Sequence, residues 1–108
     1  MAFIEALIIG AIIGALAEVA IEVLRIFLLL LADVVEWFVQ RLRHHLQDPN
    51  KVAFTLRECF QSGNYAVVQG VFDTQRNTVV GDARRIQAQQ VDDRIRAAHE
   101  RRQVVVYQ

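Results

Sequence analysis

The chain has 108 residues, of which 54% are hydrophobic, and its mean hydropathy is +0.24, a high value for one small domain in water. Its only cysteine, Cys59, excludes an intramolecular disulfide and gives no sign of a cysteine metal site. The zero net charge combines an acidic segment, residues 1–50 (net −3), with a basic segment, residues 51–108 (net +3). We therefore expect an apolar membrane element followed by a polar, water-exposed module.

The N-terminal half is predicted to be one continuous helix. No proline occurs in residues 2–47, and the only glycines there are Gly10 and Gly14. Pro49 then ends the run, because proline cannot continue a helix. Such a helix would be about 70 Å long, more than twice the ~30 Å hydrocarbon core of a bilayer. No basic residue precedes Arg25, so the segment does not read as a cleavable signal.

A helical wheel places the polar residues of this segment on one narrow face. At 100° per residue, the ionisable residues from Glu18 to Arg43, apart from Arg41, fall within an arc of about 80°. Charges in lipid are costly, so pairing of Glu18 or Glu22 with Arg25 of a neighbouring copy predicts self-association. The residues expected to form this helix–helix contact are Gly10, Ala11, Gly14, Ala15, Glu18, Glu22, Arg25, Leu29, Ala32, Asp33 and Glu36.

Two further observations bear on how this helix would lie. The spacing of Gly10 and Gly14 is the one that lets membrane helices approach closely. An alternative places Glu18 at the headgroups, with residues 19–39 as the true span.

The flanks of the helix predict its orientation. Trp37, Arg41 and Arg43 are expected at one membrane interface, and the excess of basic residues after the apolar run places that side in the cytoplasm. The predicted localisation is a single-pass membrane protein with its N-terminus outside and its C-terminal module cytoplasmic.

The remainder is predicted to be a small α-β-β-α-β module. Its expected elements are a helix over residues 50–63, strands over 65–73 and 78–89, a helix over 93–102 and a strand over 104–108. The predicted fold class is an α+β membrane protein, with a long transmembrane helix in residues 1–48 and a basic cytoplasmic α+β module in residues 49–108.

The sequence gives no indication of an enzyme, a cofactor or a metal ion. It lacks a phosphate-binding loop, an HExxH helix and a nucleophile elbow. His44 and His45 point about 100° apart on a helix, which does not suit a shared metal ligand set. Cys59 and His99 can be written as a dyad, but no third group joins them. The arginines of the module are better explained by ion pairs or by anionic lipid headgroups than by nucleic acid.

The function expected from these patterns is a homo-oligomeric, single-span membrane protein that forms a ring or barrel-like scaffold. Its partners would be its own copies and membrane lipids, with no protein partner identified. One alternative is a cation-preferring pore lined by the Glu18, Glu22 and Arg25 stripe. A further alternative is a membrane tether that recruits a partner through residues 50–108. A fourth treats the apolar half as the core of a large soluble helical assembly.

Overall fold

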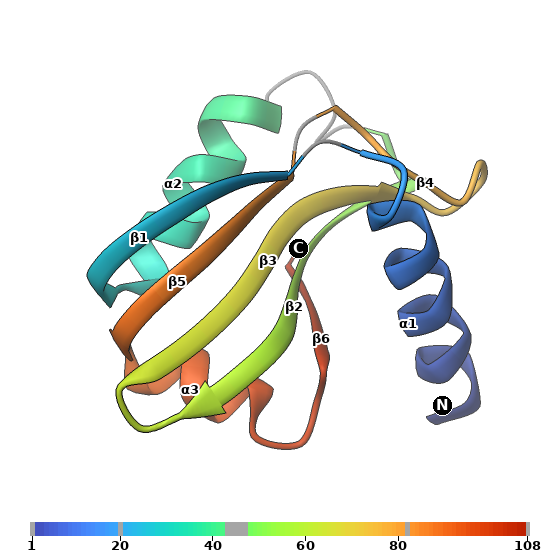
Figure 1. Cartoon of the computed structure of the whole chain (residues 1–108). Helices are drawn as coiled ribbons and strands as arrows, with labels where there is room; N and C mark the ends of the chain where they lie inside the picture. Colours follow the sequence, from blue (N-terminus) through green and yellow to red (C-terminus); the bar gives the residue numbers. More distant parts are fainter. Residues whose placement is uncertain (1, 20, 43–47, 82, 108) are drawn as a thin grey trace.

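The computed structural model describes residues 2–19, 21–42, 48–81 and 83–107, with side chains from 9–19, 21–40, 48–81 and 83–107. Figure 1 shows a strongly curved sheet with helices at its margins and behind it. The elements are α1 (Ala2–Leu16), β1 (Ile21–Leu29), α2 (Leu31–Leu42), β2 (Lys51–Gln61), β3 (Asn64–Asp73), β4 (Thr78–Val79), β5 (Ala83–Val91), α3 (Asp93–His99) and β6 (Val104–Tyr107).

The strands form one mixed sheet in the order β1-β5-β3-β2-β6, with the short β4 paired to the end of β3. The β2–β3 hairpin, the β3–β5 pair and the β2–β6 pair are antiparallel, whereas β1 runs parallel to β5. Residues 21–29, from the predicted membrane segment, therefore belong to the same sheet as the strands of the C-terminal half.

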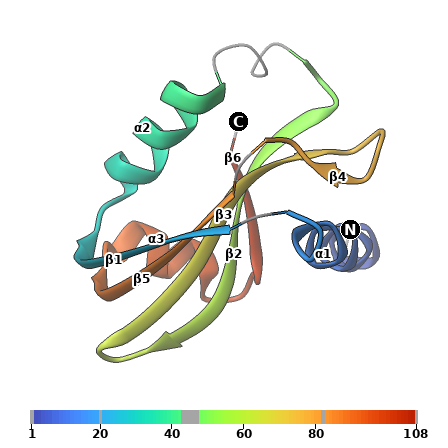
Figure 2. The same cartoon turned by 45° about the horizontal axis from the view of Figure 1, so that its top comes forward.

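Each face of the sheet carries its own hydrophobic core. On one face, Ile12 and Leu16 of α1 pack against a cluster that includes Phe54, Val68 and Phe72. On the other face, α2 and α3 cover a cluster whose members include Leu29, Val34, Trp37, Phe38, Ala53, Val71, Ile86 and Ile95. The two sets alternate along β2 and β3, as expected for strands buried on both faces. Figure 2 shows α1 and α2 at opposite ends of the curved sheet.

The prediction of one long transmembrane helix is wrong. The helical structure stops at Leu16, a turn follows at residues 17–19, and the chain continues as strand β1. At about 1.5 Å per residue, the 15 residues of α1 extend about 22 Å, short of a bilayer core of about 30 Å. Within the described ranges, no helix combines the length and apolar character needed to cross a membrane.

The physical reason lies in the β-branched and aromatic content of β1, IEVLRIFLL. Such residues lose side-chain freedom in a helix and pack well in a sheet, and here they gain a hydrogen-bonded neighbour in β5. The predicted single-pass localisation is therefore wrong as well. It placed the N-terminus outside and the module in the cytoplasm, and it depended on the long transmembrane helix. Glu22 and Arg25 lie on a sheet strand and require no lipid-facing explanation.

The C-terminal elements agree better with prediction. The strand expected over 65–73 is confirmed by β3, the helix expected from residue 93 by α3, and the strand expected from residue 104 by β6. The strand expected over 78–89 is divided into β4 and β5. The helix predicted over 50–63 is wrong: residues 51–61 form β2, which pairs with β3 and β6 on its two sides. Gly63 takes a positive φ of 80° in the β2–β3 turn.

Candidate interaction surface

The outer edge of β1 is a free sheet edge among the described residues. β1 pairs only with β5, and its register runs without a shift along the strand. The carbonyl of Leu29 accepts a hydrogen bond of 2.8 Å from the N–H of Asp92, which follows β5. Because backbone groups alternate in direction along a strand, the N–H and C=O groups of the even-numbered residues 22–28 point away from β5. These groups are available to an added strand.

The side chains of β1 alternate between the two faces of the sheet. Leu24, Ile26 and Leu28 lie on the α2 side, where they line a cleft. Arg25 lies on the opposite face, where its Nε donates a hydrogen bond of 3.1 Å to the side chain of Gln87 on β5. Phe27 shares the face of Arg25 by the alternation of the strand. The free edge therefore has apolar residues on both faces and one cation on the face away from α2.

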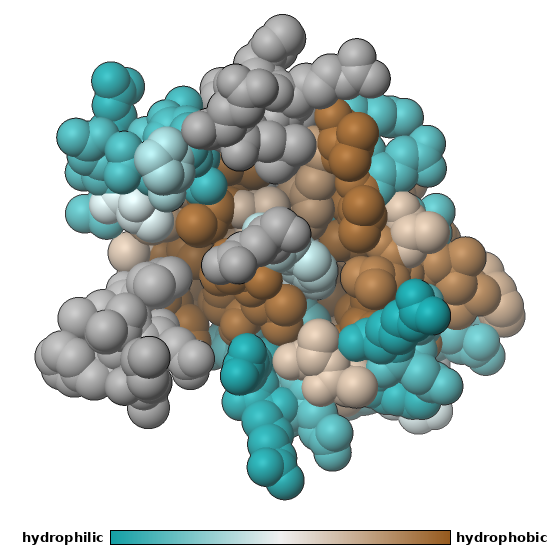
Figure 3. All heavy atoms as spheres, turned by 180° about the vertical axis from the view of Figure 1, so that it is seen from behind, coloured by the Kyte–Doolittle hydropathy of each residue, from teal (hydrophilic) through white to brown (hydrophobic). Residues whose placement is uncertain are grey.

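Exposed apolar side chains are concentrated around this edge. Among the described residues, eight large hydrophobic side chains are exposed, and six of them lie in residues 23–39: Val23, Phe27, Leu28, Leu30, Val35 and Val39. Phe27 is the most exposed of the eight, at 61%. Figure 3 shows hydrophobic residues gathered along the back of the molecule, over α2. Leu30, Val35 and Val39 line one shallow groove there. Such grouping is typical of interaction sites, whereas scattered exposed apolar residues are ordinary.

A cleft of about 340 Å³ lies between β1 and α2. Its floor is apolar and consists of side chains of β1. Its other walls are Asp33, Glu36, Trp37 and Gln40 of α2 and Arg84 of β5. The cleft is directly beside the free edge, so side chains of a strand added to β1 would lie next to its opening.

A chain of polar contacts holds the inner wall of this cleft in place. The guanidinium carbon of Arg84 lies 5.2 Å from the centroid of the Trp37 ring, and Nε of Arg84 donates to Oε1 of Gln69 at 2.7 Å. The buried amide of Gln69 donates in turn to the carbonyl of Val34 on α2, also at 2.7 Å. Because the chain runs from β5 through β3 to α2, the position of α2 over the sheet is fixed by buried hydrogen bonds as well as by packing.

Asp92 joins the end of β1 to both helices on this face. Its carboxylate accepts hydrogen bonds from the N–H of Arg94, at the start of α3, and from the N–H of Leu31, at the start of α2. These two backbone donors lower the pKa of Asp92. One side chain therefore caps α3 and ties it to the β1–α2 connection.

A second polar cluster is buried between β2, α3 and β6. Nδ1 of His99 donates to the carbonyl of Arg102 at 2.9 Å, since a carbonyl can only accept. Nε2 of His99 then accepts from Oγ1 of Thr55 at 2.7 Å, and Thr55 accepts from the hydroxyl of Tyr107 at 2.8 Å. Arg57 donates to the carbonyl of His99. Burial lowers the pKa of His99 and raises that of Tyr107. Thr55 and His99 are fully buried, so this cluster is built to join elements and offers no access to a substrate.

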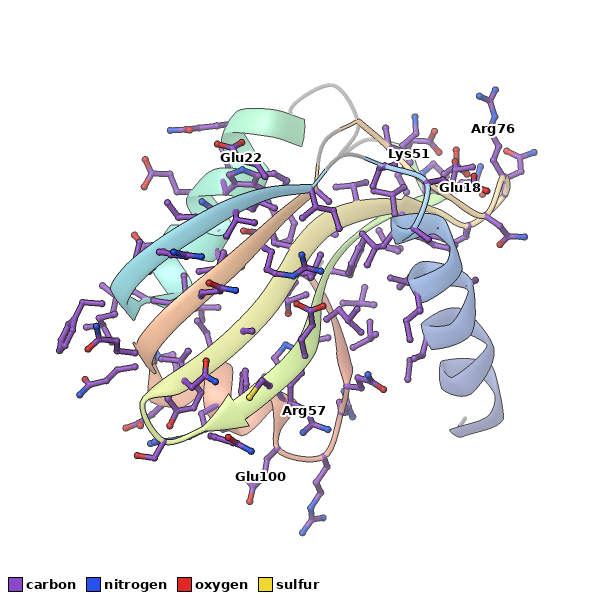
Figure 4. The ribbon with its side chains drawn as sticks, in the orientation of Figure 1. Glu18, Glu22, Lys51, Arg57, Arg76 and Glu100 are labelled. Atoms are coloured by element: carbon purple, nitrogen blue, oxygen red, sulfur yellow. The ribbon has the colours of Figure 1, made fainter. Side chains whose placement is uncertain are left out.

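The structure distributes the predicted association residues over three elements and a turn. Gly10, Ala11, Gly14 and Ala15 lie on α1. Ala11 and Ala15 pack against the core of the α1 face, and Gly10 and Gly14 are exposed with nothing within 4 Å of an added Cβ. Glu18 lies in the turn after α1, three residues before β1 begins. Figure 4 shows it near the end of α1, apart from Glu22, which points toward α2.

The other predicted residues lie on β1 and α2. Glu22, Arg25 and Leu29 are on β1, and Ala32, Asp33, Glu36 and Trp37 are on α2. Asp33, Glu36, Trp37 and Leu29 meet at the cleft, but Glu18, Glu22 and Arg25 do not form one stripe. Trp37, expected at a membrane interface, is only 9% exposed and belongs to the core. The side chain of Arg41 and the whole of Arg43 lie outside the described residues.

Sequence reasoning missed the residues that hold these sites together. Arg84 and Gln69 are far from α2 along the chain, and no local spacing connects them to Trp37. Cys59 and His99, considered together as a dyad, have separate partners, because the thiol contacts the carbonyl of Asn64 at 3.5 Å. Among the described residues, no three His, Cys, Asp or Glu side chains gather as a metal site would require.

Comparison with known proteins adds no relationship. No protein-family model, no curated protein and no solved structure matches this chain.

Proposed function

We propose that this protein has a structural role and acts by self-association, with copies meeting at the β1 surface. The β1 surface is defined as the free edge of β1 together with Val23, Phe27, Leu28 and Leu30. The observation that carries the proposal is the coincidence of the unpaired outer edge of a nine-residue strand with this group of exposed apolar side chains.

The free edge of β1 lacks most of the features that prevent edge strands from pairing. Edge strands are commonly protected by proline, by bulges, by short length or by charge. β1 has no proline and no register shift against β5, and its charged residues, Glu22 and Arg25, leave residues 26–29 uniformly apolar. The opposite edge of the sheet, β6, has only four residues. Pairing with a second copy would satisfy the open backbone groups of β1 and cover its apolar side chains.

Self-association does not depend on a membrane-spanning helix. The pore and tether alternatives both required one, and no specific feature of the described residues favours either of them. A second copy is favoured over an unrelated partner because the β1 surface is apolar and the order of its side chains allows it to pair with itself in an antiparallel direction.

The test compares the same substitution at two ends of the sheet. Val23 on β1 and Val106 on β6 are both exposed valines, at 48% and 39%. Sedimentation equilibrium of the unmodified protein should give a dimer or larger species at tens of micromolar. Val23→Lys should shift this species to monomer, because a lysine on the β1 surface would be buried unpaired.

Val106→Lys is the matched control and should leave the size unchanged. A protein that is monomeric at every concentration would refute the proposal. Equal loss of association in both variants would refute the assignment to the β1 surface.

A further inference from the structure

We propose that two copies join through an antiparallel β1–β1 pair with its two-fold axis at Ile26, giving one sheet that is continuous through both copies. This inference rests on the proposed self-association and specifies its geometry. It follows from the order of side chains along β1 and from the direction of its free backbone groups.

A two-fold axis perpendicular to the sheet restricts the possible registers. Such an axis keeps the α2 face of one copy beside the α2 face of the other, so even-numbered residues pair with even-numbered residues. The outward backbone groups of residues 22–28 then form the hydrogen-bonded pairs of an antiparallel ladder. The registers differ only in which residue lies on the axis.

The register centred on Ile26 gives the most compatible set of side-chain pairs. On the α2 face, Ile26 lies opposite Ile26 of the second copy, and Leu24 lies opposite Leu28 in both directions. On the other face, Arg25 lies opposite Phe27 in both directions, which allows the guanidinium to stack on the ring. Val23 lies opposite the backbone of Leu29 at each end, and the Leu29 side chain stays buried in its own core. Within the strand, the side chains at Ile26, Leu24 and Leu28 meet apolar partners and the one cation of each copy meets an aromatic ring, while Glu22 lies opposite Leu30, just beyond the end of the strand.

The neighbouring registers are less compatible. An axis at Arg25 places the two arginines directly opposite each other, which is unfavourable. An axis at Leu24 places the carboxylate of Glu22 against Ile26. An axis at Phe27 shortens the pairing and sets Arg25 against Leu29, whose side chain is buried in its own core.

The cleft beside β1 provides a second reason for this arrangement. It is open next to the edge and lined by Leu24, Ile26 and Leu28. In the register centred on Ile26, the same three residues of the second copy lie alongside its floor. Each copy would therefore continue the apolar floor of the other copy's cleft across the joined edge.

Cysteine cross-linking tests this register in a Cys59→Ser background. Paired residues on antiparallel strands have Cα atoms about 5.5 Å apart, within the range of a disulfide. Ile26→Cys alone should therefore give a disulfide-linked dimer under mild oxidation. Leu24→Cys alone and Leu28→Cys alone should not, because each is about 14 Å from its own equivalent along the strand. An equimolar mixture of the Leu24→Cys and Leu28→Cys proteins should cross-link.

The outcomes separate this inference from the proposed function. A dimer by sedimentation that cross-links through Leu24→Cys alone, through Leu28→Cys alone or through none of these cysteines would overturn the register and leave self-association standing. A monomer by sedimentation would overturn both. If the Ile26→Cys protein fails to fold, cross-linking in the mixture of Leu24→Cys and Leu28→Cys proteins still tests the register.

Discussion

Oγ1 of Thr55 lies 2.7 Å from Nε2 of His99, and this contact joins β2 to the end of α3. Nδ1 of His99 donates to the carbonyl of Arg102, and burial lowers the pKa of the ring, which together favour the neutral tautomer with its proton on Nδ1. The hydroxyl of Tyr107 extends the same chain to β6. The edge strand β6 is thus connected to β2 by side chains as well as by its ladder.

Stability should decrease as the pH falls through the titration range of His99. Burial holds the pKa of His99 below its usual value of 6.5 in the folded protein. As the pH falls below about 6.5, the usual pKa of the imidazole, the unfolded chain therefore binds more protons at this site, so the free energy of unfolding falls as the pH falls. Urea unfolding at several pH values should show this decline, and His99→Gln should make it smaller.

Thr55→Val should destabilise the protein by about 1–3 kcal/mol, because it leaves Nε2 of His99 without its buried donor. The shape of the side chain is nearly retained, so the loss comes from hydrogen bonding. The control is Thr78→Val, at an exposed position on β4, which should change the free energy of unfolding by less than about 0.5 kcal/mol. Equal effects of the two changes in urea unfolding would contradict the role of the network.

Gly70→Ala and Gly14→Ala should change stability in opposite directions. A Cβ at Gly70 would lie 3.1 Å from Cζ of Phe54, and displacing this buried ring should cost about 1–3 kcal/mol. A Cβ at Gly14 has nothing within 4 Å, and in a helix the change should gain about 0.5–1 kcal/mol. Thermal and urea unfolding measure both. A stabilised Gly70→Ala protein would show that the ring moves without cost.

Phe27→Ala should weaken self-association by at least about tenfold without lowering monomer stability. Each two-fold contact would bury two copies of this ring, and burial of one such side chain contributes about 1.5–3 kcal/mol. Sedimentation equilibrium gives the association constant, and Phe27→Leu should keep most of it. Unchanged association in Phe27→Ala would place the contact elsewhere.

Local patterns were sufficient where an element had clear end signals. The strand at residues 65–73 is bounded by Gly63 and a polar turn, and α3 begins after the acidic pair Asp92–Asp93. The prediction of a helix at the position of β2 was wrong because the sequence fits both periods. Val52, Leu56 and Phe60 fit a helical period, whereas Val52, Phe54 and Leu56 fit a strand period. The pairing of β2 with strands on both sides decided between them.

The N-terminal half could not be predicted from its own periodicity. What makes residues 21–29 a strand is β5, whose residues are 62 positions later in the chain, and no spacing within the apolar run indicates this partner. The candidate site was found in part. Asp33 and Glu36 were selected as members of a polar stripe, and they do line the cleft. Arg84 and Gln69, which fix its inner wall, are brought there only by the tertiary fold.

The parallel pairing of β1 with β5 also sets an order for folding. The β2–β3 hairpin can form from adjacent residues, whereas β1 has no sheet partner until Val91 has been synthesised. During that interval the apolar residues 21–30 have left the ribosome and remain uncovered. Closing so long a loop slows folding, and uncovered apolar strands of this kind are prone to aggregate. Chaperone demand during synthesis should therefore be greatest between the emergence of β1 and that of β5.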